Sequence, residues 1–308
     1  MNEVIHTVEL SKHYGRVQAV EEISLSVRKG EIYGFLGLNG AGKTTTIRML
    51  LGMIRPSSGA SYLLGERIDG GNYGIWNQVG YLVEIPYSYP ELTVKENLSI
   101  ICKLRGIGDK KVVDQVIDQL QLEPYADIKA GHLSLGNAQR LGLAKALLHK
   151  PAVLILDEPV NGLDPAGIVE IRELLQNLAH QHGVTIFISS HILGEMAKLA
   201  TRIGIIHQGR LLQEVDADQL EVLLRKRLLL NARDKTAALN ALAGAGYSVR
   251  NNEEGFMEII DDQAIQRPEE IACFMVQHNC PPTLLQVEEE DLESYFLRTI
   301  EETGGNVQ

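Results

Sequence analysis

Short runs of apolar residues alternate along the first two thirds of the chain with segments that have helical spacing. The runs at 32–36, 152–156 and 184–188 are almost free of polar side chains, which is typical of strands buried on both faces of a sheet. Helical patterns occur at 46–51 and 166–182. Buried strands that alternate with helices predict an α/β fold with a parallel sheet.

The segments ahead of the first buried run have a different pattern. Residues 3–10 are predicted to form a strand, and residues 23–27 alternate between apolar and polar side chains like a half-buried strand. Residues 28–31, Arg-Lys-Gly-Glu, are predicted to form a hairpin turn. Two strands that pair here indicate an antiparallel β layer beside the core.

The middle of the chain is predicted to be mostly helical over residues 93–126, with breaks at 106–108 and at Pro124. Thr93 and Glu96 have the spacing of a capping box. The segment 133–140 is predicted to lead into a further helix at 141–149.

The last third of the chain has an alternation of its own. After a linking helix at 218–224, strands are predicted at 227–232, 247–250, 256–260 and 283–287, and helices at 236–243, 268–278 and 292–300. The order βαββαβ predicts a small α+β domain of ferredoxin-like type. The acidic run 288–291 is expected to be a solvated turn and helix start rather than a metal site.

A glycine-rich loop follows the buried run 32–36 and precedes a helix: Gly37, Leu38, Asn39, Gly40, Ala41, Gly42, Lys43, Thr44 and Thr45. Glycines let backbone N–H groups approach a phosphate chain closely, and the helix N-terminus adds partial positive charge. Lys43 is expected to reach the β and γ oxygens, and the Thr44 hydroxyl to bind Mg²⁺. The loop alone indicates phosphate binding, which kinases, GTPases and motor ATPases share.

Two acidic residues, Asp157 and Glu158, end the buried run that begins at Ala152. Charge in this position is costly unless a ligand needs it. Asp157 fits a second Mg²⁺ ligand of a phosphate-loop ATPase, and Glu158 could polarise the attacking water. His191 directly follows the next buried strand. It is either structural or close to the γ-phosphate.

Three other positions leave two interpretations open. Tyr14, expected in a turn, either stacks on a purine base or packs on the surface. Ser134 and Gly136 lie at a helix start. They form either another anion-binding helix terminus or an ordinary capped helix.

Composition limits the classes of partner that the protein can bind. The formal net charge is −11 and 44% of the residues are hydrophobic, as in a globular protein without a nucleic-acid surface. The three cysteines, Cys102, Cys273 and Cys280, lack zinc-type spacing. The chain shows neither a signal peptide nor an apolar run of about 20 residues, so we expect a cytoplasmic protein that reaches a membrane through a partner.

Taken in order, the motifs over roughly residues 3–215 resemble the nucleotide-binding subunit of an ABC transporter. The specific element is the Leu-Ser-x-Gly-x-x-Gln sequence that begins at Leu133, shortly before the Asp-Glu strand. This sequence is called the signature below. The resemblance implies that Tyr14 stacks on adenine and that the glycine-rich loop binds ATP. It also implies that Thr44 and Asp157 hold Mg²⁺, that Glu158 is the catalytic base and that His191 is the switch histidine.

The resemblance also implies an assembly. Ser134 and Gly136 would contact the γ-phosphate held by a second subunit, and Asp164 would lie in the loop that joins the two sites. One set of motifs needs a second copy, and a homodimer is the simplest solution. A separate transmembrane permease would hold the dimer on the inner face of the cell membrane.

Two positions depart from the family pattern. Glu84 stands where most members have a glutamine that senses Mg²⁺ and couples to the permease; glutamate keeps an oxygen ligand but adds charge. A glutamate at this position resembles the ATPases of exporters for peptide antibiotics such as bacitracin and lantibiotics. Asn137 and Ala138 are not the commonest residues at the variable positions of the signature. Its nucleotide-facing positions, Ser134 and Gly136, are intact.

We therefore expect a P-loop NTPase core with an antiparallel β subdomain and a helical subdomain at about 85–150. The nucleotide-binding domain would span 1–218 and an accessory α+β domain 219–308. The ATPase of another ABC transporter, either an importer or an exporter of ions or drugs, would share this fold and chemistry. A soluble ABC ATPase of the ribosome is disfavoured by the single motif set and the acidic charge, and a DNA-repair ATPase by the short distance between loop and signature.

Overall fold

The computed structural model describes residues 3–302 except 70, 72, 85, 110, 253 and 254. These residues fall into two compact units. The first contains the residues up to Asp218 together with those from Ile300 on, and the second contains Gln219–Thr299. The outer ends of the two predicted domains, and residue 85 at the predicted start of the helical subdomain, lie outside the described residues.

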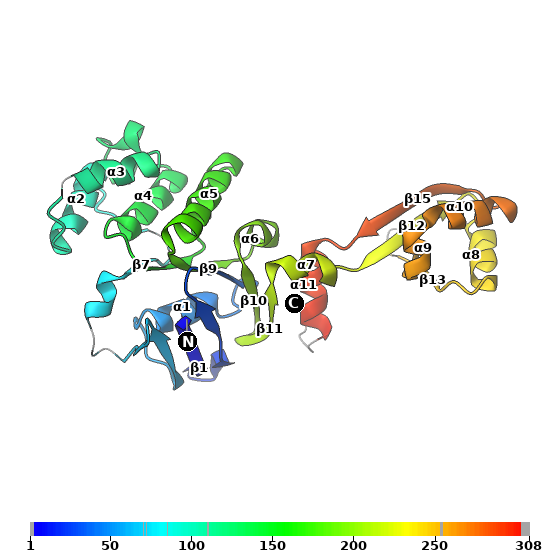
Figure 1. Cartoon of the computed structure of the whole chain (residues 1–308), viewed down its shortest axis with the longest axis horizontal. Coiled ribbons are helices and arrows are strands. Elements are labelled where there is room, and N and C mark those ends of the chain that lie inside the picture. The colour runs from blue at the N-terminus through cyan, green and yellow to red at the C-terminus, as the bar shows by residue number, and fades with distance from the viewer. Residues whose placement is uncertain are drawn as a thin grey trace. The chain divides into compact units, whose positions relative to one another are not determined.

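A six-stranded sheet forms the centre of the first unit, in the order β11-β10-β4-β9-β8-β7 (Figure 1). Neighbouring strands are parallel from β10 to β7, and β11 runs antiparallel to β10. The strand bounds are β4 Ile32–Leu36, β7 Val79–Leu82, β8 Val153–Asp157, β9 Thr185–Ser190, β10 Arg202–His207 and β11 Arg210–Asp216.

The predicted buried strands are confirmed. Every residue of β4, β8 and β9 is buried, so their polar residues at the carboxyl ends are held in a low-polarity setting. The ring of Phe187 lies 5.3 Å from that of Phe35 and 5.5 Å from that of Tyr33, measured between centroids. These aromatic contacts join β4 to β9, two of the strands whose carboxyl ends carry the site.

An antiparallel sheet precedes this centre, with the order β2-β1-β5-β6 and β3 also paired with β1. Its strands are β1 Glu3–Tyr14, β2 Val17–Ile23, β3 Ser26–Arg28, β5 Ser58–Leu63 and β6 Glu66–Arg67. The predicted antiparallel layer is therefore present. The predicted hairpin at 28–31 is wrong, because β3 pairs with β1 while β4 joins the parallel sheet.

The helices that accompany these strands in the described part of the first unit are α1 Lys43–Leu50, α2 Val94–Leu104, α3 Lys111–Gln119, α4 Leu135–Leu147, α5 Pro165–His182 and α6 Leu193–Leu199. Short 3-10 turns lie at Gly74–Asn77, Glu123–Tyr125 and Ala130–His132. Helices α2, α3 and α4 pack against one another, and α4 also packs against β7 (Figure 1). The capping box of α2 is confirmed, since Thr93 and Glu96 exchange hydrogen bonds of 2.8 and 3.1 Å.

Helix α4 starts six residues before the predicted start at 141. The Ser134 hydroxyl accepts a hydrogen bond from the Asn137 N–H, so it caps the helix at Leu135. The helix start expected at Ser134 and Gly136 is therefore confirmed, and most of the segment predicted to lead into the helix belongs to the helix itself.

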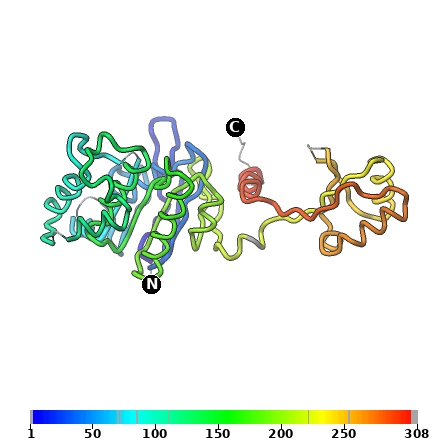
Figure 2. The backbone as a smooth tube through the Cα atoms, turned by 90° about the horizontal axis from the view of Figure 1, so that it is seen from above, coloured from blue at the N-terminus to red at the C-terminus, as the bar shows by residue number. Residues whose placement is uncertain are grey.

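The second unit contains a four-stranded antiparallel sheet in the order β13-β14-β12-β15. Figures 1 and 2 show β12 and β15 running side by side. The strands are β12 Lys226–Ala232, β13 Val249–Asn251, β14 Met257–Ile259 and β15 Pro282–Glu289, and the helices of this last third of the chain are α7 Ala217–Leu223, α8 Lys235–Gly244, α9 Asp262–Gln266, α10 Pro268–Gln277 and α11 Leu292–Glu302. Leu228, Leu230, Met257 and Ile271 are fully or almost fully buried in the core of the unit.

The acidic run is only partly the solvated turn that its sequence predicts. Glu288 and Glu289 belong to β15 and form ion pairs with Arg227 at 2.6 Å and Lys226 at 3.5 Å. Asp291 directly precedes α11, and its carboxylate accepts a hydrogen bond from the Ser294 N–H at 2.7 Å. Across the described residues, no helix is long and apolar enough to span a membrane.

Candidate active site

The glycine-rich loop connects β4 to α1 and has the conformation that its glycines allow. Gly40 and Gly42 have φ values of 81° and 109°, in a region that L side chains rarely adopt. A Cβ atom on Gly42 would lie 2.5 Å from the Ala19 carbonyl oxygen. Gly42 is the N-cap of α1 and has no side chain to bond the first N–H groups. Those groups are therefore left to bind an anion such as a phosphate.

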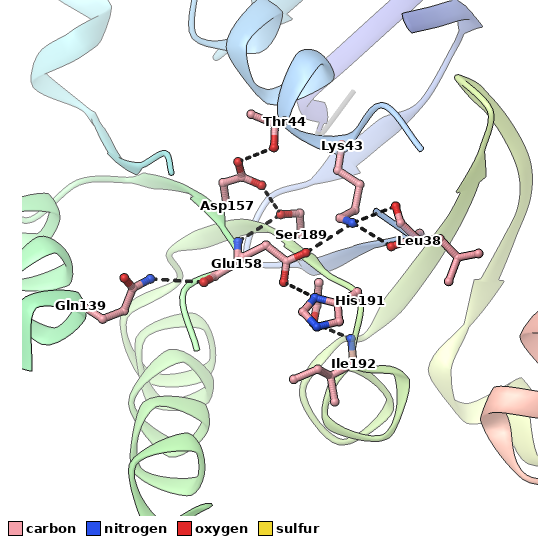
Figure 3. A network of polar contacts seen from close by, with 11 residues as sticks. Leu38, Lys43, Thr44, Gln139, Asp157, Glu158, Ser189, His191 and Ile192 are labelled. Atoms are coloured by element: carbon pink, nitrogen blue, oxygen red, sulfur yellow. Dashed lines mark hydrogen bonds and ion pairs between the residues drawn. The ribbon is translucent and has the colours of Figure 1, made fainter. Parts of the chain in front are cut away.

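Lys43 is the cation of this loop. Its side chain is buried, and Nζ donates to the carbonyl oxygens of Gly37 at 2.7 Å and Leu38 at 3.2 Å. Nζ also lies 3.3 Å from Glu158 Oε1 (Figure 3). The ammonium group is thus fixed inside the loop, where it can neutralise a phosphate oxygen.

Asp157, the last residue of β8, is 3% exposed and receives two hydroxyl hydrogen bonds. Thr44 Oγ1 donates to Oδ2 at 2.7 Å, and Ser189 Oγ donates to Oδ1 at 2.6 Å (Figure 3). A carboxylate and a hydroxyl side by side are suitable Mg²⁺ ligands when substrate phosphates complete the shell. Within the described residues, no cluster of three His, Cys, Asp or Glu side chains could hold a metal alone.

Glu158 leaves the strand with a φ of 48°, a left-handed conformation that is costly for a residue with a side chain. The Ser189 hydroxyl accepts its N–H at 3.1 Å, and Gln139 Nε2 donates to its carbonyl oxygen at 3.2 Å. The carboxylate lies between Lys43 and His191, whose Nδ1 is 2.9 Å from Glu158 Oε2 (Figure 3). This carboxylate can accept a proton beside the phosphate loop.

Tyr14 is the last residue of β1 rather than part of a turn, and it pairs with Val17 in β2. Its side chain is 47% exposed, and Lys12 Nζ lies 5.1 Å from the ring centroid. The open ring can stack on another flat group, so the structure retains the base-stacking interpretation.

Ser134, Gly136 and Asp164 line a different hollow, of about 740 Å³. Ser134 caps α4, and Asp164 caps α5 by accepting a hydrogen bond from the Gly167 N–H at 2.9 Å. A Cβ atom on Gly136 would lie 3.2 Å from the Gly162 carbonyl oxygen. The structure thus joins these three residues in a second, polar site separate from the Lys43–Glu158 group.

Glu84 lies beyond the end of β7 with a φ of 58°. Its carboxylate is 56% exposed and forms an ion pair with Arg48 of α1. The structure therefore brings together two of the three predicted metal ligands, Thr44 and Asp157, and places Glu84 on a cation instead.

Two residues that hold the site together, Ser189 and Gln139, were not predicted from the sequence. Both are buried, and both bond to the backbone of Glu158. A polar residue near the end of an otherwise apolar strand was an available signal for Ser189. Gln139 belongs to the Leu-Ser-x-Gly-x-x-Gln sequence, but that pattern predicts no contact for it.

Comparisons with known proteins agree with this geometry. Residues 20–161 match the sequence profile of the ABC transporter family. The chain is 41% identical over its full length, and over the full length of the relative, to the bacitracin transport ATP-binding protein BcrA of Bacillus licheniformis. It is 34% identical to the lantibiotic transport ATP-binding protein SrtF of Streptococcus pyogenes, with 73% of this chain and 97% of that protein covered.

A solved ATP-binding subunit of an ABC transporter has a similar fold, with a TM-score of 0.65 and 29% identity over 71% of this chain and 92% of the other. The predicted resemblance to bacitracin- and lantibiotic-type ATPases is therefore confirmed. The phosphate loop on β4 and α1, the carboxylates that end β8 and the signature on α4 are the features of one family, and the chain belongs to the ATP-binding proteins of ABC transporters.

Proposed function

We propose that this protein hydrolyses ATP to ADP and phosphate and that this reaction drives an exporter of peptide antibiotics. One observation carries the catalytic part. Glu158 places a carboxylate between Lys43 and His191, beside a loop that ends at the start of α1, where no side chain caps the helix. A base, a cation and an anion cradle therefore converge on one point, as phosphoryl transfer requires.

Each residue has a separate role in this proposal. The loop from Gly37 to Thr45 binds the triphosphate, and Tyr14 stacks on the adenine. Thr44 and Asp157 hold Mg²⁺, which supplies charge neutralisation on the phosphate oxygens when bound. Glu158 takes a proton from the water whose oxygen attacks the γ-phosphorus, while the bond to the bridging oxygen breaks. His191 orients Glu158 and contacts the γ-phosphate.

The second hollow supports a homodimer. Ser134 and Gly136 present a capping hydroxyl and helix N–H groups, yet the Lys43–Glu158 group lies elsewhere on the same chain. A second copy placed head to tail would bring this hollow onto the γ-phosphate of its partner, with Asp164 in the loop between the two sites. Closure would then depend on ATP, and hydrolysis would reopen the pair.

The share of this chain that each relative matches supports a bacitracin-like peptide as the cargo. The bacitracin-type relative matches the whole chain, including the second unit, whereas the match to the lantibiotic-type relative covers 73% of it. We infer that the first compact unit is the nucleotide-binding domain and that Gln219–Thr299 form an accessory domain of ferredoxin-like architecture, which ends before the predicted bound of 308. We also infer that the cargo is a peptide antibiotic of the bacitracin kind.

The permease would dock at a groove beside α2 and α4. A hollow of about 380 Å³ is lined by exposed Tyr81, Tyr87 and Leu104 and by the cations Arg105 and Lys145, with no acidic residue among the described residues of its lining. Burial lowers the pKa of Lys145 to about 8. An apolar permease segment with one carboxylate would cover the aromatic groups and stabilise both charges, and the protein would sit on the inner face of the membrane.

Affinity purification from gently solubilised membranes, with partners identified by mass spectrometry, tests transport coupling. We expect a polytopic membrane protein in near-equal amount, and we expect Lys145→Met to reduce its recovery while ATPase activity persists. Recovery only with ribosomal or DNA-bound proteins would leave the proposed ATPase activity standing but would contradict the proposed role in transport. Deletion of the protein should raise sensitivity to bacitracin-like peptides, and unchanged sensitivity across a peptide panel would overturn the cargo.

A further inference from the structure

Ser189 is the shared partner of the two carboxylate residues that end β8. It lies in the neighbouring strand β9, is completely buried and has its hydroxyl between two groups. The O–H donates to Asp157 Oδ1 at 2.6 Å, and the same oxygen accepts the Glu158 N–H at 3.1 Å. A hydroxyl can do both at once because it has one donor and two lone pairs.

The backbone of Glu158 is therefore held at both of its polar groups. Ser189 holds the N–H, and Gln139 holds the carbonyl oxygen at 3.2 Å. With a φ of 48°, Glu158 would relax toward ordinary strand geometry unless its surroundings fixed it. Such relaxation would turn its carboxylate away from Lys43 and His191.

We propose that Ser189 is a positioning residue for the ATPase reaction, an inference that rests on the function proposed above. Its hydroxyl fixes the rotamer of Asp157, so that Oδ2 remains beside Thr44 Oγ1, and it fixes the backbone that aims Glu158. One side chain thus sets the distance between the Mg²⁺ ligands and the base. Ser189 is completely buried and acts through Asp157 and Glu158 rather than as a ligand itself.

This role differs in its consequences from simple packing. Loss of the hydroxyl leaves Oδ1 of Asp157 and the N–H of Glu158 without their partner, so both the Mg²⁺ affinity and kcat should fall. The bonds that hold Lys43 Nζ to the Gly37 and Leu38 carbonyl oxygens do not involve Ser189, so the affinity for ATP measured without Mg²⁺ should stay within about twofold. A merely structural defect would not separate these quantities.

Thr185 offers a matched control on the same strand. It is also buried, and its hydroxyl accepts a hydrogen bond from the Gly30 N–H at 3.0 Å, at the opposite end of β9. Thr185→Val therefore removes a buried hydroxyl without touching the carboxylates. Ser189→Cys provides an intermediate, since a thiol has similar shape but is a weak donor.

The experiment measures ATPase rates of the full chain against free Mg²⁺ at saturating ATP. Equilibrium binding of ATP without Mg²⁺ is measured on the same proteins and should be unchanged within about twofold. Loss of an outer-shell partner commonly costs about 10–100-fold in metal affinity or activity, so we expect Ser189→Ala to lose at least tenfold in kcat and to need more Mg²⁺, with Ser189→Cys between. Thr185→Val should keep the wild-type Mg²⁺ curve.

The outcomes separate this inference from the proposed function. Wild-type protein without ATPase activity would overturn the proposed function itself. Active wild-type protein with an unchanged Mg²⁺ curve in Ser189→Ala, or an equal loss in Thr185→Val, would overturn the positioning role alone. If Ser189→Ala does not fold, the Ser189→Cys curve decides between the same two results.

Discussion

Oε1 of Glu158 lies 3.3 Å from Nζ of Lys43, so the proposed base forms an ion pair with the cation of the phosphate loop. Glu158→Gln keeps the shape of the side chain but removes its ability to take a proton. We expect ATP binding to persist and turnover to fall by about 10²–10⁴-fold, the usual contribution of a positioned general base. ATPase assays and equilibrium binding of ATP measure the two effects.

The same variant tests the dimer. With Mg²⁺ and ATP, Glu158→Gln should accumulate as a stable homodimer in size-exclusion chromatography with light scattering, because hydrolysis no longer reopens the pair. Wild-type protein with ADP serves as the control and should remain monomeric. Turnover at the wild-type rate would remove Glu158 from the role of base.

Thr44 gives a prediction about the metal. Thr44→Val is nearly isosteric but loses the hydroxyl that donates to Asp157 Oδ2 at 2.7 Å, whereas Thr44→Ser retains a hydroxyl. We expect the valine variant to require at least about tenfold more free Mg²⁺ for half-maximal ATPase activity, and the serine variant to stay near wild type. Addition of EDTA should abolish turnover in all three proteins. Identical Mg²⁺ curves for the valine and serine variants would contradict the ligand role.

Glu84→Gln is expected to separate hydrolysis from transport. The Glu84–Arg48 ion pair is largely exposed, and pairs of this kind contribute about 0–1 kcal/mol, so the variant should fold normally. If Glu84 serves coupling, ATPase activity should largely persist while resistance to the exported peptide drops. The readouts are the ATPase rate of the purified protein and the inhibitory peptide concentration in cells. An equal loss of both would speak against coupling.

His149 predicts a dependence of stability on pH. Its Nε2 donates to the Val79 carbonyl oxygen at 3.0 Å, while the buried Nδ1 has no protein partner in the described structure. Burial, with a smaller effect of the nearby Arg105 charge, lowers the pKa of His149. The unfolded chain, with a His pKa of about 6.5, therefore binds a proton before the folded chain does.

It follows that the free energy of unfolding decreases as the pH falls below about 6.5 and toward the lowered pKa of the folded state. Urea unfolding at pH values of about 7.5, 6.5 and 5.5 measures this slope. In His149→Gln the free energy of unfolding should change less with pH than it does in the wild type. His132→Gln, which changes an exposed histidine, should keep the wild-type slope. A wild-type slope in His149→Gln would show that other groups govern this pH range.

Much of this fold follows from local pattern. The strands β4, β8 and β9 are buried on both faces and are therefore apolar throughout, and the residues after them gather at one edge because parallel strands end together. That geometry explains why Lys43, Asp157, Glu158 and His191 could be predicted from the sequence to lie near one another.

Other features depend on contacts that no local pattern records. The turn at 28–31 has hairpin composition, yet it connects two different sheets because β1 already offers β3 a partner. Likewise, Glu288 and Glu289 look like a solvated acidic run, but Lys226 and Arg227 lie opposite them on β12. The position of Ser189 between two carboxylate residues depends on the register of β8 against β9.

The pairing of β12 with β15 has one more consequence. Lys226 at the start of β12 lies opposite Glu289 at the end of β15, so the chain enters and leaves this sheet at adjoining points. Modules with adjoining ends can be spliced into a host chain or excised from it with little disturbance. The second unit thus has the geometry of a module that can be inserted into an ATPase, or lost from it, without change to the ATPase fold. A chimera could replace it with a short loop.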